Sequence, residues 1–439
     1  MITTRRDVLR IVCAASLIPD VLRCMPTDRG SSATVADLRA LFPQLATRSN
    51  GMPLIYLDSA GTTLRPGPVL ETILQFYQHR NANPGKGIHS LANHAMEEYE
   101  NARVQVAKFI NAAEPLEIIW TKGTTEALNL FASSWAVPRL RSGDEIILTI
   151  SEHASCMLPL QIAAKKTGAQ IRYIDVDEDG RLRLDQLDKA LSSRTKLVAF
   201  TSVSNVLGAV NPAKDICRRA RQFGARVLVD LAQSVPHFSV DVQDMGCDFA
   251  AFSSHKMLGP MGAGALYARR DAMEEMSVYQ AGANMAHAHG LAEWEYAAGA
   301  LRFGAGTPSV ADVLGFASAA QLLTSLDRDA LWRREQQLTK YALERLHSVP
   351  RLQILGPKTA ENRVSIFSFV MDGIPTARIV SALDEAGICI RAGDLACMQL
   401  LEKFNVQSAA RASLYAYTTE SEVESLATAM ENLIKSVTS

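Results

Sequence analysis

The sequence predicts an α/β protein built on a large, mostly parallel sheet. Short and mainly apolar runs indicate strands that are buried on both faces, as parallel strands are: 144–148, 197–200, 227–229 and 249–252. Segments of helical length separate these runs, which is the alternation typical of α/β domains. Polar residues follow the runs directly, so we expect a ligand site at the carboxyl edge of the sheet.

The order of the elements divides the chain of 439 residues into two predicted domains. Residues 53–310 form the large domain with the parallel sheet. A smaller α+β domain combines residues 34–52, which include a segment with helical spacing, with residues 311–439. Residues 1–33 are an extension that belongs to neither domain.

Composition is that of an ordinary globular protein, with 48% apolar residues, 21% charged residues and a formal net charge of −1. This balance indicates neither nucleic acid nor a membrane surface as a partner. The seven cysteines are scattered and form no Cys-x-x-Cys pair, which argues against a disulfide framework and a zinc site. His287 and His289 alternate in a loop, a spacing that does not favour a metal pair. We expect no metal.

The amino-terminal extension has two interpretations. Arg5-Arg6 followed by the apolar residues 11–18 resembles a twin-arginine export signal, which would span residues 4–18. The apolar part is only about eight residues long, and Pro19-Asp20 interrupts it. A cytoplasmic protein with a short docking or unstructured extension is therefore the favoured prediction, and export is the alternative.

The first candidate binding element is a strand, turn and helix at 118–130. Gly123, Thr124 and Thr125 stand where the helix begins, so free backbone N–H groups, two hydroxyls and the positive end of the helix dipole face one point. That combination binds a phosphate group, although Gly-Thr-Thr alone is also an ordinary helix cap.

Two further polar residues follow buried strands. His153 comes after the run 144–148, where an imidazole can stack on an aromatic ring, and Asn205 lies in the loop after the run 197–200. Asn205 can hydrogen-bond both a cofactor and a substrate carboxylate, although asparagine in a loop is often plain turn chemistry. A helix is predicted at 213–223.

The stretch 225–266 organises the rest of the chain. Asp230 ends one buried strand, and Ser253, His255 and Lys256 end the next, ahead of a glycine-rich loop. This arrangement suits pyridoxal phosphate: the lysine forms a Schiff base with it, the buried aspartate keeps the pyridine nitrogen protonated, and Ser253 with His255 reaches the phosphate. Without Asp230, the Ser-x-x-Lys pattern alone would be more typical of a surface lysine after an ordinary strand.

The motifs Asp230-Leu231-Ala232-Gln233, Cys247-Asp248-Phe249 and Ser253-Ser254-His255-Lys256 resemble the class V aminotransferase group. Within that group, the chain is most similar to the group II cysteine desulfurase and selenocysteine lyase family, over about residues 34–435. The resemblance implies the PLP-dependent transferase fold type I, pyridoxal 5'-phosphate as cofactor and a homodimer with shared sites. It also implies that Gln233 contacts the cofactor and that His153 stacks on its ring.

The same resemblance assigns residues that bind the substrate or the neighbouring site. Arg411, in Arg-Ala-Ser-Leu-x-x-Tyr, anchors the substrate carboxylate and Arg391 assists it, which suits the bidentate geometry of guanidinium. His89, in a turn-rich loop before a long helix at 91–110, faces the substrate pocket. Thr307 reaches the phosphate of the neighbouring subunit.

A departure from the family concerns the nucleophilic thiol. Relatives carry this cysteine five positions after the first of the two arginines, where this chain has Ala396, and a cysteine follows as Cys397. The loop either absorbs this shift of one residue or turns the thiol away. Cys156 and Cys389 are the alternative thiols.

The resulting prediction is a cysteine desulfurase that converts L-cysteine to L-alanine, with a persulfide on Cys397 that is passed to a sulfur acceptor protein. The alternatives are another reaction of the class, such as that of a selenocysteine lyase, a C–S lyase or an amino-acid epimerase, which would use Lys256 and His153 without a thiol. A binding or cargo protein that retains the fold is the alternative outside catalysis.

Overall fold

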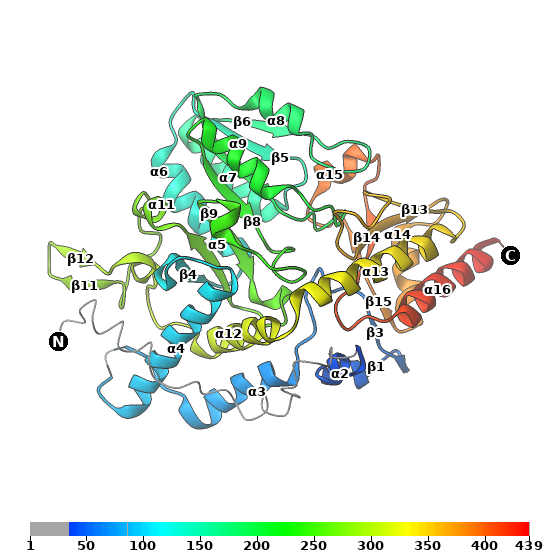
Figure 1. The fold of residues 1–439 in the computed structure, drawn as a ribbon, viewed down its shortest axis with the longest axis horizontal. Coiled ribbons are helices and arrows are strands. Elements are labelled where there is room, and N and C mark those ends of the chain that lie inside the picture. Colours follow the sequence, from blue (N-terminus) through cyan, green and yellow to red (C-terminus); the bar gives the residue numbers. More distant parts are fainter. Residues whose placement is uncertain (1–34, 86, 439) are drawn as a thin grey trace.

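The computed structural model describes residues 35–85 and 87–438, and a seven-stranded sheet lies at its centre (Figure 1). The strand order is β4-β10-β9-β8-β7-β5-β6. The strands are β4 Ile118–Thr121, β5 Glu145–Thr149, β6 Gln170–Ile174, β7 Thr195–Thr201, β8 Arg226–Asp230, β9 Phe249–Ser253 and β10 Gly264–Ala268. Neighbours from β6 to β9 pair in parallel, whereas β10 is antiparallel to β9 and β4. The predicted sheet and its four apolar runs are confirmed.

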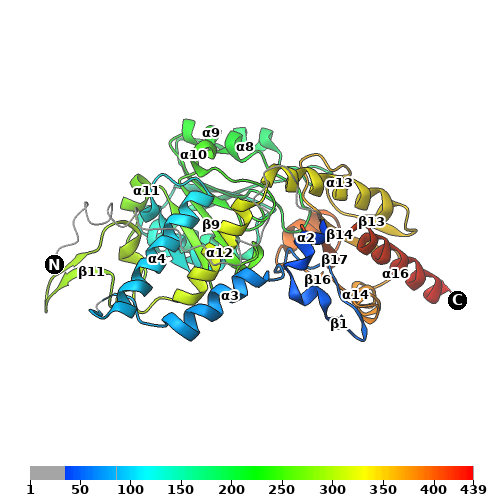
Figure 2. The same ribbon diagram turned by 60° about the horizontal axis from the view of Figure 1, so that its bottom comes forward.

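Helices cover both faces of this sheet. Successive residues of a strand point to opposite faces, so the apolar strands bring apolar side chains to both of them. Val198 and Val229 belong to one apolar cluster, and their neighbours Leu197 and Leu228 belong to another. The first cluster includes residues of α4 Ser90–Phe109, α9 Ala213–Gln222 and α12 Val310–Ser325. The second includes residues of α5 Thr124–Phe131 and α7 Ala154–Thr167. Figure 2 shows α12 beside α4 and α3 Gly67–Gln75.

A smaller antiparallel sheet of four strands lies to one side of the large sheet (Figures 1 and 2). Its order is β13-β14-β17-β16, with β13 Leu352–Ile354, β14 Ile366–Met371, β16 Arg391–Gly393 and β17 Ala409–Ser413. The helices α13 Arg328–His347, α14 Thr376–Glu385 and α16 Glu420–Thr438 lie beside this sheet. An α+β carboxyl-terminal part was predicted from the sequence, and its elements are present.

The shorter elements complete the described chain. They are α2 Val35–Ala40, β1 Arg48–Ser49, β2 Met52–Pro53, β3 Ile55–Tyr56, α6 Val137–Arg139, α8 Leu184–Ala190, α10 Val242–Met245, α11 Arg270–Glu274, β11 Ala286–His289, β12 Trp294–Tyr296, β15 Ile388–Cys389 and α15 Met398–Lys403. No helix among the described residues is both long and apolar enough to cross a bilayer. The stretch 4–18, interpreted above as a possible export signal, lies outside the described residues.

Two contacts join the amino-terminal segment to the rest of the molecule. Leu38 and Phe42 pack into the cluster under the large sheet. β3, a few residues later, pairs in parallel with β15 of the carboxyl-terminal part. The division into residues 34–52, 53–310 and 311–439 stays a prediction.

Gly208 lies in close contact with the segment that leads into β14, so a substitution at Gly208 tests this contact. Its φ is +70°, and a Cβ there would lie 2.8 Å from the Val364 carbonyl oxygen and 3.0 Å from that of Ile366. Gly224 has a similar φ of +74° and no atom within 4 Å of its Cβ position. We expect Gly224→Ala to cost about 1 kcal/mol through backbone strain alone, and Gly208→Ala to cost about 1–3 kcal/mol more. Urea denaturation of both variants measures the difference, and equal midpoints would contradict this contact.

Candidate active site

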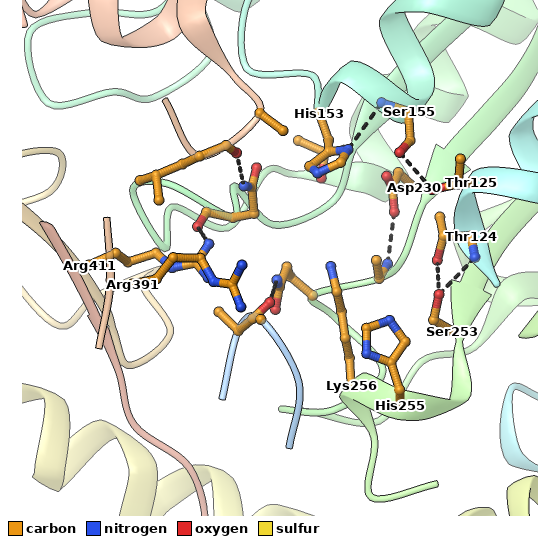
Figure 3. A pocket seen from close by; sticks show the side chains of 18 of the residues that line it. Thr124, Thr125, His153, Ser155, Asp230, Ser253, His255, Lys256, Arg391 and Arg411 are labelled. Carbon is orange, nitrogen blue, oxygen red and sulfur yellow. Dashed lines mark hydrogen bonds between the residues drawn. The ribbon is translucent and has the colours of Figure 1, made fainter. Parts of the chain in front are cut away.

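A cavity of about 400 Å³ lies where the carboxyl ends of the large sheet meet the strands of the small sheet (Figure 3). This is the edge at which open α/β sheets bind ligands, and the volume suits a small molecule. Most of the predicted site residues line it: Thr124, Thr125, His153, Asn205, Asp230, Gln233, Ser253, His255, Lys256, Arg391 and Arg411. His89, Thr307 and Cys397 are not among its lining residues.

One end of the cavity is a hydroxyl-lined helix start. The Thr124 backbone N–H and the Thr124 Oγ1 both lie 2.7 Å from the Ser253 Oγ, and Thr125 Oγ1 lies 2.8 Å from Ser155 Oγ. Gly264 on β10 makes this closeness possible, because a Cβ there would lie 2.5 Å from the Gly123 Cα. Hydroxyls at the positive end of α5 fit an anion such as a phosphate group.

Asp230 is a buried carboxylate, and no cationic side chain of the described residues is bonded to it. Its side chain is 5% exposed, and Oδ1 accepts a hydrogen bond of 2.9 Å from the Ala232 backbone N–H. Burial is the largest influence on its pKa and raises it, while the Ala232 N–H and the Lys256 charge act in the opposite direction. A protonated ring nitrogen in the cavity would supply the charge partner that this carboxylate lacks.

Lys256 projects into the cavity from the turn after β9 (Figure 3). Burial lowers the pKa of its ammonium group to about 8; Asp230 opposes this change, and the charges of Arg411 and Arg391 add to it. A measurable fraction of the side chain is therefore the neutral amine at physiological pH, which is the form that attacks a carbonyl group.

His153 caps α7 and faces the cavity as a neutral ring. Its Nδ1 accepts a hydrogen bond of 3.0 Å from the Ser155 backbone N–H, so the proton of the neutral ring is on Nε2. Burial, together with the charges of Lys256 and Arg411, lowers its pKa to about 4. His255 is also kept neutral, because burial lowers its pKa to about 4, and its Nδ1 lies 3.2 Å from the Thr62 Oγ1.

Arg391 and Arg411 lie directly opposite each other on the adjacent strands β16 and β17. Two like charges in this position destabilise a sheet unless an anion joins them. Asp58, which the sequence did not single out, joins them here: Arg391 donates two hydrogen bonds of 2.8 and 3.1 Å to its carboxylate, and Arg411 NH2 lies 3.4 Å from its Oδ1. Gly61 admits this arrangement, since a Cβ there would lie 2.5 Å from Arg391 NH2.

Asn205 and Gln233 hold the walls of the cavity together. The Asn205 side-chain amide donates to the Leu395 carbonyl oxygen at 2.9 Å, and the backbone carbonyl oxygen of Asn205 accepts from Arg411 Nη1 at 2.9 Å. The Gln233 amide donates to the Ala60 carbonyl oxygen at 2.8 Å. Both amides are therefore engaged with the protein, and their predicted contacts to the cofactor or the substrate stay predictions.

Comparison with known proteins agrees with this geometry. The family model described as Aminotransferase class-V matches residues 55–426. A cysteine desulfurase from Pectobacterium carotovorum is 41% identical over 403 residues, which cover 92% of this chain and 98% of that protein. The chain belongs to the class V aminotransferase family. Within this family, it belongs with the cysteine desulfurases.

Other members of the family show the same likeness. A probable cysteine desulfurase from Halalkalibacterium halodurans is 39% identical and is covered over 97% of its length, whereas the match spans 63% of the cysteine desulfurase from Synechococcus elongatus. The crystal structure of the cysteine desulfurase CsdA from Escherichia coli superposes with a TM-score of 0.85 at 32% identity, over 92% of this chain and 99% of that one. The predicted fold type I is confirmed.

In this class V aminotransferase, the loop after Arg391 does not bring Cys397 to the cavity. Ala396 lines the cavity, and the Cys397 side chain is 0% exposed behind it. Its Sγ lies 3.3 Å from the Glu152 carbonyl oxygen. Of the two outcomes that the sequence left open, the structure shows the one in which the thiol turns away.

Glu152, which the sequence placed only as a neighbour of His153, is a fully buried carboxyl group. Its Oε1 accepts hydrogen bonds from the Thr149 hydroxyl at 2.6 Å and the Thr201 backbone N–H at 3.0 Å. Burial, with a smaller contribution from the Asp230 charge, raises its pKa to about 8 against these two hydrogen bonds. The side chain is therefore largely a neutral acid at pH 7.

This raised pKa predicts a pH-dependent loss of stability. Because the folded protein holds the Glu152 proton more tightly than the unfolded chain, the contribution is complete below about pH 4.5 and is lost as pH rises towards about 8. Glu152→Gln keeps a neutral side chain of the same shape and removes this contribution. We expect the thermal midpoint of the wild type to fall more than that of Glu152→Gln between about pH 5 and pH 8. Exposed Glu178→Gln is the control, and parallel curves for Glu152→Gln and the wild type would refute the neutral acid.

Proposed function

We propose that this protein is a pyridoxal-phosphate-dependent cysteine desulfurase, which converts L-cysteine to L-alanine and delivers the sulfur to an acceptor. The observation that carries the proposal is the convergence of Lys256, Asp230 and the hydroxyl-lined start of α5 on one cavity that also holds two arginines. The curated relatives that are named cysteine desulfurases support the choice of reaction.

The residues of the cavity fit pyridoxal 5'-phosphate. Lys256 offers an amine with a lowered pKa to the aldehyde, and Asp230 offers an unpaired buried carboxylate to the ring nitrogen. Thr124, Thr125 and Ser253 offer hydroxyls and a helix start to the phosphate. When bound, the cofactor supplies an electron sink for the electron pair that is released at the substrate carbon.

The chain itself binds and orients the amino acid. The substrate carboxylate takes the place of Asp58 on Arg391 and Arg411, because both arginines reach the cavity and guanidinium binds carboxylate in a bidentate manner. The Lys256 amine is the base that removes the proton from the substrate Cα. His153, a neutral ring at the cavity wall, stacks on the bound ring system.

We further propose that the protein acts in the cytoplasm as a homodimer, with His89 and Thr307 serving the cavity of the partner. Neither residue lines the cavity of its own chain. The β11–β12 hairpin supports the dimer, because it extends away from the body of the molecule (Figures 1 and 2) and Trp294 is 62% exposed on it. Leu291 and Tyr296 are exposed on the same segment, and exposed aromatic side chains are enriched at protein–protein interfaces.

A C–S lyase, which releases pyruvate, ammonia and sulfide from cysteine, is the second candidate. The observation in its favour is that no cysteine is among the residues that line the cavity in the described chain. The product separates the two reactions, because only desulfuration forms alanine.

Lys256→Ala tests the proposed chemistry. The wild type should take up pyridoxal phosphate with a visible absorbance band and, with a reducing thiol present, form alanine from L-cysteine. Lys256→Ala should lose the protonated imine band and at least about a hundredfold of the rate, since it lacks the proposed base. Lys189→Ala, an exposed change far from the cavity, is the control. A wild type that binds no cofactor, or a variant as active as the wild type, would refute the proposal.

Arg411→Ala tests the carboxylate anchor. Loss of a charge-assisted contact costs about 1.5–3 kcal/mol, so the KM for cysteine should rise about 10- to 100-fold while the cofactor spectrum is unchanged. Arg334→Ala is the matched control, because Arg334 does not line the cavity and donates to the carbonyl oxygens of Ala416 and Thr418. Cofactor loss at an unchanged KM would make Arg411 a structural residue instead.

A further inference from the structure

In the loop between Arg391 and α15, the side chain at position 396 that faces the cavity is the methyl group of an alanine and not a thiol. Ala396 and Asp394 line the cavity, whereas Cys397 is the residue that precedes α15 and packs in an apolar cluster with Leu400 and Leu401. Gln399 closes over the sulfur: its side-chain amide lies 3.6 Å from the Cys397 Sγ and donates to the Glu152 carbonyl oxygen at 2.9 Å.

Hydrogen bonds on consecutive residues keep the loop in this orientation. The Leu395 carbonyl oxygen accepts from the Asn205 side chain at 2.9 Å, and the Ala396 carbonyl oxygen accepts from the Ala154 N–H at 2.8 Å. The Ala396 N–H donates to the Asp394 carboxylate at 3.0 Å, and the Cys397 N–H donates to the Asp394 carbonyl oxygen at 3.0 Å. Turning Cys397 into the cavity would break several of these bonds at once.

The surroundings of Cys397 also oppose the reactive form of its thiol. Burial is the largest influence on the pKa of the thiol and raises it, and the charge of the nearby Asp394 carboxylate acts in the same direction. A thiol must ionise to attack sulfur, so this position is unsuited to a nucleophile. A thiol on the cavity side of the loop would ionise more readily than Cys397. Lys256 and Arg391 line the cavity, and their positive charges favour a thiolate.

No other cysteine of the described chain replaces it. Cys156, Cys217 and Cys247 are buried, Cys389 is half-buried on β15, and none of them lines the cavity. Burial is the largest influence on the pKa of each of these four thiols and raises it.

We propose that the sulfur acceptor of this enzyme is a small external thiol, which enters the cavity beside Ala396. This inference rests on the proposed desulfurase function. The thiolate attacks the sulfur of the bound cysteine, an S–S bond forms and the Cβ–S bond breaks. The electron pair stays on the substrate, a proton is added at Cβ, and the products are alanine and the perthiol of the acceptor. A second equivalent of the thiol then yields a disulfide and hydrogen sulfide.

The test is a single turnover of the holoenzyme in excess over L-cysteine, so that the substrate cannot also serve as the acceptor. The wild type and Cys397→Ser should form little alanine alone, and both should gain at least about tenfold when 2-mercaptoethanol is added. The acceptor perthiol should be trapped by alkylation. Ala396→Cys should form alanine without added thiol and gain about 32 Da on the introduced sulfur.

Two outcomes overturn the inference. A full turnover of alanine by the wild type without added thiol, with an adduct on Cys397 and loss of this burst in Cys397→Ser, would show that the enzyme carries its own persulfide. Pyruvate and ammonia in place of alanine, in the wild type and in Ala396→Cys alike, would overturn the desulfurase proposal itself and the acceptor with it.

Discussion

The burial of both faces of the large sheet is the constraint on which the site depends. Strands covered by helices on each side must be apolar along their length, because an unpaired polar side chain there would be costly. Polar side chains are therefore displaced to the strand ends: Asp230 ends β8, Ser253 ends β9, and His153 follows β5. Since the ends of parallel strands meet at one edge, residues distant in sequence become neighbours in one cavity.

Burial at this edge also determines the protonation states of the site. It raises the pKa of Asp230 and Glu152 and lowers that of Lys256 and His153, in each case because the charged form is poorly solvated. An amine with a lowered pKa next to a carboxylate without a bonded cation is poised to take a ligand that supplies an aldehyde and a protonated ring nitrogen. Fit to the cofactor is thus an electrostatic property of the protein as well as a matter of shape.

Asp58 links the two halves of the molecule at the same point. It lies in the turn after β3, and its carboxylate neutralises two arginines from neighbouring strands of the small sheet. A substrate carboxylate can replace Asp58 on these arginines without creating an unpaired buried charge, provided that Asp58 itself reaches solvent or a cation. The two arginines therefore already hold a carboxylate in the geometry that the proposed substrate would use.

By itself, the sequence was sufficient to predict the parallel sheet, its order of polar strand ends and the meeting of Lys256, Asp230 and Thr124 at one edge of the sheet. These features follow from local pattern: apolar runs form buried strands, and the residue after each run lies at the ligand edge. Asp58 and Gly61 were not identified, because their importance arises only when β16 and β17 place two arginines over the turn after β3. The orientation of Cys397 was likewise decided by tertiary structure, since hydrogen bonds from Asn205 and Ala154, distant in sequence, determine which side of the loop faces the cavity.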